Sequence, residues 1–207
     1  MARICLAVVL AIGAAPVQAQ PSPPAVTIQP SIDSAAQRET LRAFSTCVAK
    51  SRPLWARQTL SYPYLSDAQA EAAAEALTGS DKCVPNYGQI TVRTSGVVGN
   101  LAEYFLRAEL EKAGLDRLTA VLQTVDPLNA SEDFALCVAA RDPTAARDLA
   151  LSVPGSSSEL QAFGRFAPHV RPCVNDGQQV TVDLQSLRAL VSVALYRGTT
   201  TVLAARN

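Results

Sequence analysis

The chain has 207 residues, of which 18 are basic, 18 are acidic and 48% are hydrophobic, so its formal net charge is zero. This composition is typical of a globular protein, and the balanced charge argues against a nucleic-acid-binding protein, which carries a surplus of basic side chains. His169 is the single histidine, which excludes zinc sites built from three histidines.

Residues 1–19 have the features of a secretory signal peptide. Arg3 precedes an apolar run of about a dozen residues, and Ala19 ends a stretch of small residues suited to cleavage before Gln20. A membrane anchor is the less favoured alternative, because a spanning helix needs about 20 apolar residues. We therefore expect an exported protein, periplasmic or secreted, that does not span the membrane after cleavage.

Residues 20–33 contain four prolines, which oppose a regular helix and favour extended, solvated backbone. We predict that this segment is a Pro-rich flexible tether between the cleavage site and the folded body.

The chain contains an internal repeat. A shift of 90 residues aligns 44–107 with 134–197 without a gap and gives 15 identities in 64 positions. All four cysteines that follow the predicted signal peptide obey this shift. We predict helical repeat 1 at 34–107, a connecting segment at 108–133, helical repeat 2 at 134–197 and a C-terminal tail at 198–207.

Each repeat shows the same succession of local signals. An amphipathic helix comes first, a proline then begins a second helix, and a serine caps a third helix. A segment with period two follows, at 90–92 or 180–182, and predicts a short strand that either pairs with its copy or does not form. Another amphipathic helix closes the repeat. The predicted fold class is therefore mainly α, with two tandem disulfide-stapled helical repeats and space for a short strand in each.

The connecting segment also carries helix signals. Residues 108–113 extend the closing helix of repeat 1, and Gly114 ends that helix. Residues 116–123 predict a further helical turn or two.

Four cysteines in an exported chain predict disulfides, for which three pairings are possible. The duplication favours one bridge in each repeat, Cys47–Cys83 and Cys137–Cys173. A zinc site or a redox-active pair is less favoured, because both are usually built on close spacings such as C-x-x-C.

The sequence carries no G-x-S-x-G, Walker, H-E-x-x-H or dinucleotide-binding motif. Glu71 and Glu75 would share a helix face and could form a carboxylate pair, although most such charges lie on a solvated surface. His169 follows a proline at a predicted helix end, where a surface role is more common than catalysis. We predict no catalytic residue, no metal and no cofactor.

Two further sets of side chains attract attention. The arginines that recur in both repeats fit a structural role near helix ends better than a repeated anion contact, and they are Arg57, Arg147, Arg107 and Arg197. Aromatic side chains that occur only in repeat 1 are either core residues or partner contacts, and they are Trp55, Tyr62 and Tyr64.

The motifs F-x-x-C-V-A, D-P-x-x-A-R, a second cysteine, Q-x-T-V and L-Y-R follow one another between Phe134 and Arg197. This pattern resembles a group of uncharacterised exported two-repeat, cysteine-containing proteins of alphaproteobacteria. The resemblance covers roughly Phe44 to Arg197, and repeat 1 departs from it at Arg52 and at residues 97–98. It implies an exported tandem-repeat protein and implies no activity.

These observations favour a non-catalytic binding or structural module of the bacterial envelope, with an envelope protein or a cell-wall component as its partner. The alternative is an envelope enzyme that uses a carboxylate pair or a redox-active cysteine pair.

Overall fold

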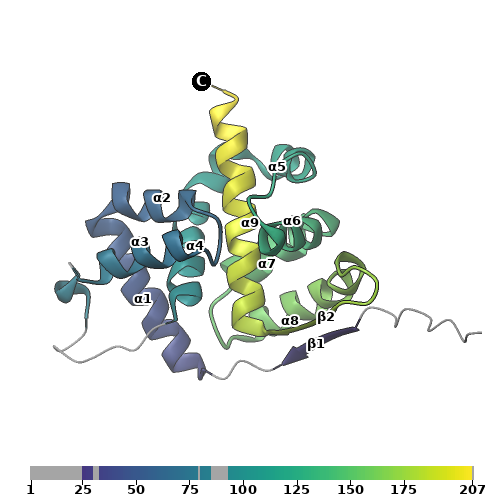
Figure 1. Cartoon of the computed structure of the whole chain (residues 1–207), viewed down its shortest axis with the longest axis horizontal. Helices are drawn as coiled ribbons and strands as arrows, with labels where there is room; N and C mark the ends of the chain where they lie inside the picture. The colour runs from purple at the N-terminus through teal and green to yellow at the C-terminus, as the bar shows by residue number, and fades with distance from the viewer. Residues whose placement is uncertain (1–24, 30–32, 79, 85–92, 207) are drawn as a thin grey trace, which may run out of the picture.

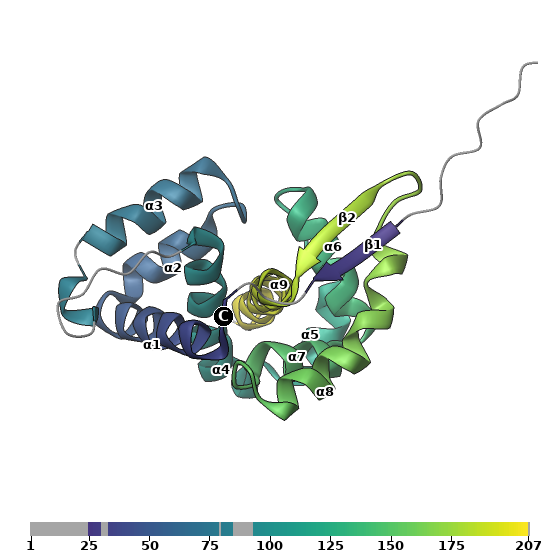
Figure 2. The ribbon, with the colours of Figure 1, turned by 90° about the horizontal axis from the view of Figure 1, so that it is seen from below.

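One long helix, α9 (Leu184–Ala204), stands between two groups of helices (Figure 1). The computed structural model describes residues 25–29, 33–78, 80–84 and 93–206. The first group is α1 (Ala35–Ser51), α2 (Pro53–Ser61), α3 (Asp67–Thr78) and α4 (Thr94–Ala113). The second group is α5 (Leu115–Leu122), α6 (Ala130–Arg141), α7 (Pro143–Leu151) and α8 (Ser157–Phe166). Seen along α9 in Figure 2, the two groups lie on opposite sides of it.

The prediction of a mainly α fold with two disulfides is confirmed. Cys47–Cys83 joins α1 to a 3-10 turn at Asp81–Cys83, and Cys137–Cys173 joins α6 to a 3-10 turn at Arg171–Cys173. Both pairs have a sequence separation of 36. Disulfides persist in oxidising environments, so the two bridges indicate an extracytoplasmic location. Among the described residues, no helix has both the length and the apolar character needed to cross a membrane.

The helix starts follow the local signals in the sequence. The Asp142 carboxylate accepts a hydrogen bond from the Ala145 N–H, and Pro143 is the first residue of α7. Arg52, which occupies the same place before α2, makes no side-chain cap. Gly114 ends α4 with a φ of 81°, and α5 begins directly after it, as the connecting segment predicts.

Three pairs of corresponding helices, α2 with α7, α3 with α8 and α4 with α9, begin 90 positions apart. The helices α2 and α7 begin at Pro53 and Pro143, and both have nine residues. The helices α4 and α9 begin at Thr94 and Leu184. The predicted alignment of the repeats therefore also aligns the first residues of these helices.

The two halves meet where α4 crosses α9. At this crossing a Cβ atom added to Gly99 would lie 2.4 Å from the Cβ atom of Ala189, so only glycine allows the approach. α9 also divides its side chains between two hydrophobic cores. Val193 and Tyr196 belong to the core of the first half, and Leu187 and Leu195 belong to the core of the second. The crossing therefore joins both cores through one helix.

The predicted flexible tether is wrong for part of its length. Ala25–Gln29 forms strand β1, which pairs in parallel with β2 (Gln179–Asp183). Val26 and Ile28 pack against the core of the second half, and this burial explains why the segment is held. The predicted strand at 180–182 therefore forms and pairs with β1. Its predicted copy at 90–92 lies outside the described residues.

The predicted C-terminal tail is also wrong, because α9 continues to Ala204. Gly198 lets α5 approach this part of the helix: an added Cβ atom would lie 2.5 Å from the Leu118 side chain. Thr199 and Val202 are buried in the same stretch. Packing against α5 therefore extends the helix beyond the repeat.

Candidate functional site

The aromatic side chains predicted as partner contacts have different environments. Tyr64 is 1% exposed, and its hydroxyl group donates to the Ser95 carbonyl oxygen at 3.5 Å. Burial raises its pKa. Trp55 and Tyr62 are half-buried, and the Arg52 guanidinium lies 5.5 Å from the Trp55 ring centroid. Tyr64 is therefore a core residue, and its assignment as a partner contact is wrong.

Two of the recurring arginines make reciprocal contacts between the halves. Arg107 on α4 donates to the carbonyl oxygen of Leu151, the last residue of α7, at 2.8 Å. Arg197 on α9 donates at 2.8 Å to the carbonyl oxygen of Tyr62, which follows the last residue of α2. Each cation thus lies at the carbonyl end of a helix in the opposite half, where the helix dipole favours positive charge.

The other two recurring arginines differ from each other. Arg57 donates to the Glu109 carboxylate, and its guanidinium lies 4.1 Å from the Phe105 ring centroid. Arg147 instead pairs with its neighbour Asp148 at 2.6 Å. The two residues therefore share a position in the alignment but not a contact.

A buried ionic cluster, which the sequence analysis did not predict, connects four helices from both halves. Arg188 on α9 donates to Glu103 on α4 at 2.8 Å and to Glu159 on α8 at 3.0 Å. Arg38 on α1 donates to both carboxylate oxygens of Glu159, at 2.8 and 2.9 Å. The side chains of all four residues are at most 9% exposed. Arg188 gives a sequence signal for this cluster, because it is a charged residue between the apolar residues Leu187 and Ala189.

The Glu159 carboxylate has a lowered pKa. Burial alone would raise it, but the Gly155 N–H at 2.7 Å and the guanidinium groups of Arg38 and Arg188 outweigh burial. Ser156 caps α8, as predicted: its Oγ accepts from the Glu159 N–H at 3.2 Å. The Glu159 side chain accepts from the N–H of Gly155, the residue before the cap, rather than from the N–H of Ser156 as in a capping box.

A groove of about 730 Å³ runs between α6 and β2. The Cys137–Cys173 disulfide forms part of its wall. Apolar side chains from α6, β2 and α9 line it, and they include Phe134, Val180, Val182 and Leu190. In the described residues the edge of β2 that is remote from β1 has no backbone partner, and this edge lies along the groove.

Leu65 lines the same groove in an unusual backbone conformation. Its φ is 63°, which is uncommon for a residue other than glycine, and its side chain is 57% exposed. The corresponding residue of the second half is Gly155, with a φ of 77°. The left-handed conformation therefore recurs in both halves, but in the first half it presents a leucine at the groove.

Hydrogen bonds on both sides fix the position of Leu65. Its N–H donates to Gln69 at 2.9 Å, and the preceding N–H of Tyr64 donates to the buried Glu132 carboxylate at 2.7 Å. The Asn129 side chain donates to the Tyr64 carbonyl oxygen at 2.6 Å. The loop is thus fastened to the start of α6, whose residues form the groove.

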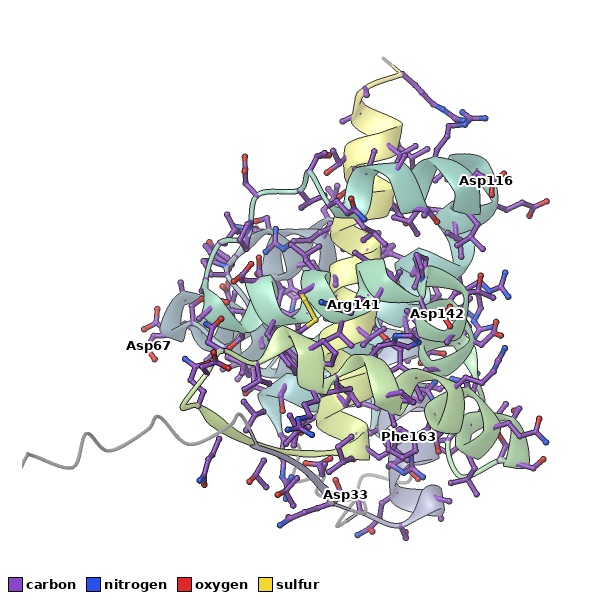
Figure 3. The ribbon with its side chains drawn as sticks, turned by 90° about the vertical axis from the view of Figure 1, so that its right-hand side faces the viewer. Asp33, Asp67, Asp116, Arg141, Asp142 and Phe163 are labelled. Carbon is purple, nitrogen blue, oxygen red and sulfur yellow. A yellow bond between two sulfur atoms is a disulfide. The ribbon has the colours of Figure 1, made fainter. Side chains whose placement is uncertain are left out.

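A second groove of about 740 Å³ adjoins α6 and shares Asp133 and Cys137 with the first. Arg141 lines it and lies beside the disulfide in Figure 3, where its guanidinium donates to the Pro172 carbonyl oxygen at 3.4 Å. Asp126 and Asp133 contribute carboxylates to this surface. The two grooves therefore meet at an acidic position on α6.

The chain matches no family model, no curated protein and no solved structure.

The remaining sequence candidates do not converge on this surface. Glu71 and Glu75 are exposed on α3. His169 lies 3.8 Å from Asp142. Within the described ranges, no group of three or more His, Cys, Asp or Glu side chains could hold a metal ion. What the groove offers chemically is an apolar lining, a carboxylate and main-chain groups of β2 that have no strand partner among the described residues, which are the elements of a binding site.

Proposed function

We propose that this protein is an exported, non-catalytic binding module of the bacterial envelope, and that its partner occupies the groove between α6 and β2. The observation that carries this proposal is the edge of β2 opposite β1, which has no strand partner in the described part of the chain and lies beside an apolar lining. An exposed strand edge is a template for pairing with another chain, and proteins usually cover or disrupt it. The partner is an envelope protein or a cell-wall component.

The position of Leu65 supports the same groove. A non-glycine residue in the left-handed region costs of order 1 kcal/mol and persists only where the surroundings hold it there. Here Gln69 and the Tyr64 contacts hold it, and the leucine side chain is exposed at the groove. An apolar side chain held in this way is suited to contact a partner.

Site-specific photocrosslinking in the producing cells tests this function. A benzophenone side chain at Ser131, which lines the groove on α6, should give a crosslinked adduct. The same group at Leu160, which is 61% exposed on α8, is the matched control and should not. Equal adducts at both positions, or none at Ser131, would contradict the proposal.

Export has its own test. If residues 1–19 are a signal peptide, the N-terminal sequence of the isolated protein should begin at Gln20.

We also infer that the two halves arose by duplication. Three observations support this beyond the sequence alignment. Gly99 and Ala189, which are aligned positions, meet at the helix crossing. Arg107 and Arg197 make reciprocal contacts, and the left-handed conformation recurs after 90 residues. An experimental structure in which residues 44–61 and 134–151 do not superpose would contradict duplication.

The enzymatic alternative has less support. A general acid needs a raised pKa, whereas the described carboxylates with resolved shifts, Asp148 and Glu159, are both lowered. For Asp148, burial opposes this shift and the guanidinium groups of Arg147 and Arg165 cause it.

The redox alternative has a separate test. A redox-active cysteine pair would need a labile disulfide, and peptide mapping under non-reducing conditions would then detect free thiols.

A further inference from the structure

We propose that the groove binds an extended peptide, which adds a strand to the edge of β2 opposite β1 and places a basic side chain near Asp133. This inference rests on the proposed function and specifies the chemistry of the ligand.

The main chain of β2 provides the first part of the site. The strand has five residues, and all five pair with β1 in parallel register. In such a pair alternate N–H and C=O groups point away from the partner strand, so those of β2 lie along the groove. A peptide in extended conformation can satisfy them, and it rises by about 3.3 Å per residue along the strand. Figure 2 shows β1 along one side of β2, and the proposed peptide would lie along the other.

The lining of the groove provides the second part. Side chains of an added strand alternate between two faces, so every second residue of the peptide points to the same side. Phe134, Leu190 and the disulfide give that side an apolar surface. Leu65 lies at the groove with more than half of its side chain exposed. These contacts favour a peptide with aliphatic residues at alternate positions.

The charge of the groove selects between basic and acidic peptides. Asp133 is exposed in the first turn of α6 and is the charged residue among those that line the groove. Asp126 adds a second carboxylate in the adjoining groove. A lysine or arginine side chain in the peptide would be attracted to these carboxylates, whereas a glutamate would be repelled.

Defined peptides test the strand addition. The probe is acetyl-Lys-Thr-Val-Thr-Val-Thr-Lys-amide, labelled with a fluorophore and titrated with the full-length mature protein. Two further peptides carry N-methyl groups on the odd or on the even residues. In an added strand, only every second residue donates its N–H group to the edge of β2. We therefore expect one methylated peptide to lose about tenfold or more in affinity and the other to bind nearly as well as the parent.

Equal affinity of the two methylated peptides, or no binding of the parent, would overturn the strand addition. If the Ser131 adduct still forms in cells, such a result leaves the proposed function intact, because the groove would hold its partner in another way. If the adduct is absent as well, both proposals fail.

A charge exchange tests the role of Asp133. The same peptide with glutamates in place of both lysines should bind several-fold more weakly, and Asp133→Asn should reduce this preference. Asp116→Asn is the matched control, because Asp116 lies in the first turn of the neighbouring helix α5 and is outside the groove lining. Figure 3 shows Asp116 well away from Arg141. A preference that survives Asp133→Asn would overturn the assignment of this carboxylate.

Discussion

Glu159 holds together segments that are far apart in the sequence. Its carboxylate binds Arg38 from the start of the first half, Arg188 from the last helix and the N–H of Gly155. The side chain is fully buried. A buried carboxylate with several charge-assisted hydrogen bonds cannot lose its charge without leaving these partners unpaired.

We predict that Glu159→Gln lowers the free energy of unfolding by about 3–5 kcal/mol at pH 7, because the buried Arg38 guanidinium loses its carboxylate partner and Arg188 keeps only Glu103. The measurement is urea denaturation of the variant and the original protein. Glu71→Gln, an exposed change on α3, is the control and should have little effect.

The same variant has a predicted dependence on pH. The pKa of Glu159 lies below its ordinary value of 4.5, so the folded state favours the charged carboxylate. Its stabilising effect is complete above that ordinary value and is lost as the pH falls toward the pKa of the folded state. The original protein should therefore lose stability below about pH 4.5 more steeply than Glu159→Gln. Parallel curves would contradict this role.

The crossing of α4 and α9 depends on the small size of two residues. Gly99 and Ala189 let the helix backbones approach, and a methyl group at Gly99 would collide with Ala189. The larger residues on both sides of α9 then reach into their cores.

We predict that Gly99→Ala lowers the free energy of unfolding by about 1–3 kcal/mol, because the added methyl group forces the helices apart. Gly164→Ala on α8 is a matched control, since nothing lies within 4 Å of the position its Cβ would occupy. That change should raise stability by up to about 1 kcal/mol through helix propensity. The measurement is thermal unfolding of both variants and the original protein. An unchanged stability of Gly99→Ala would contradict the prediction and show that the crossing can adjust.

Elements with local signals could be predicted from the sequence. The Asp142–Pro143 pair and the serine at 156 set the starts of α7 and α8 through contacts within four residues. The strand β1 could not be predicted in this way, because its partner β2 is remote in the sequence. The groove is likewise built from α6, β2, α9 and Leu65, which only the tertiary fold brings together.

The two disulfides act on the molecule as a whole. Each closes a loop of similar length, so chain entropy assigns them similar stabilisation of about 3–4 kcal/mol. Their positions differ: Cys137 and Cys173 line the groove, whereas Cys47 and Cys83 are not part of its lining.

We predict that replacing Cys47 and Cys83 with serine lowers stability by about 3–4 kcal/mol and leaves the affinity for the lysine-containing peptide unchanged. Replacing Cys137 and Cys173 should lower stability by a similar amount and should also weaken peptide binding, because a wall of the groove is lost. The measurements are urea denaturation and fluorescence titration. Equal effects of both replacements on affinity would contradict the placement of the binding site.

The parallel pairing of β1 with β2 has a consequence for the order in which the protein is completed. During synthesis the segment from Ala25 to Gln29 emerges early, but its hydrogen-bonding partner emerges only when the ribosome has passed Asp183. Arg38 in the first half also waits, because its counter-charge Glu159 lies on α8. A nascent chain of this protein should therefore remain sensitive to proteases until its last helix has been made, and should then close in a single step.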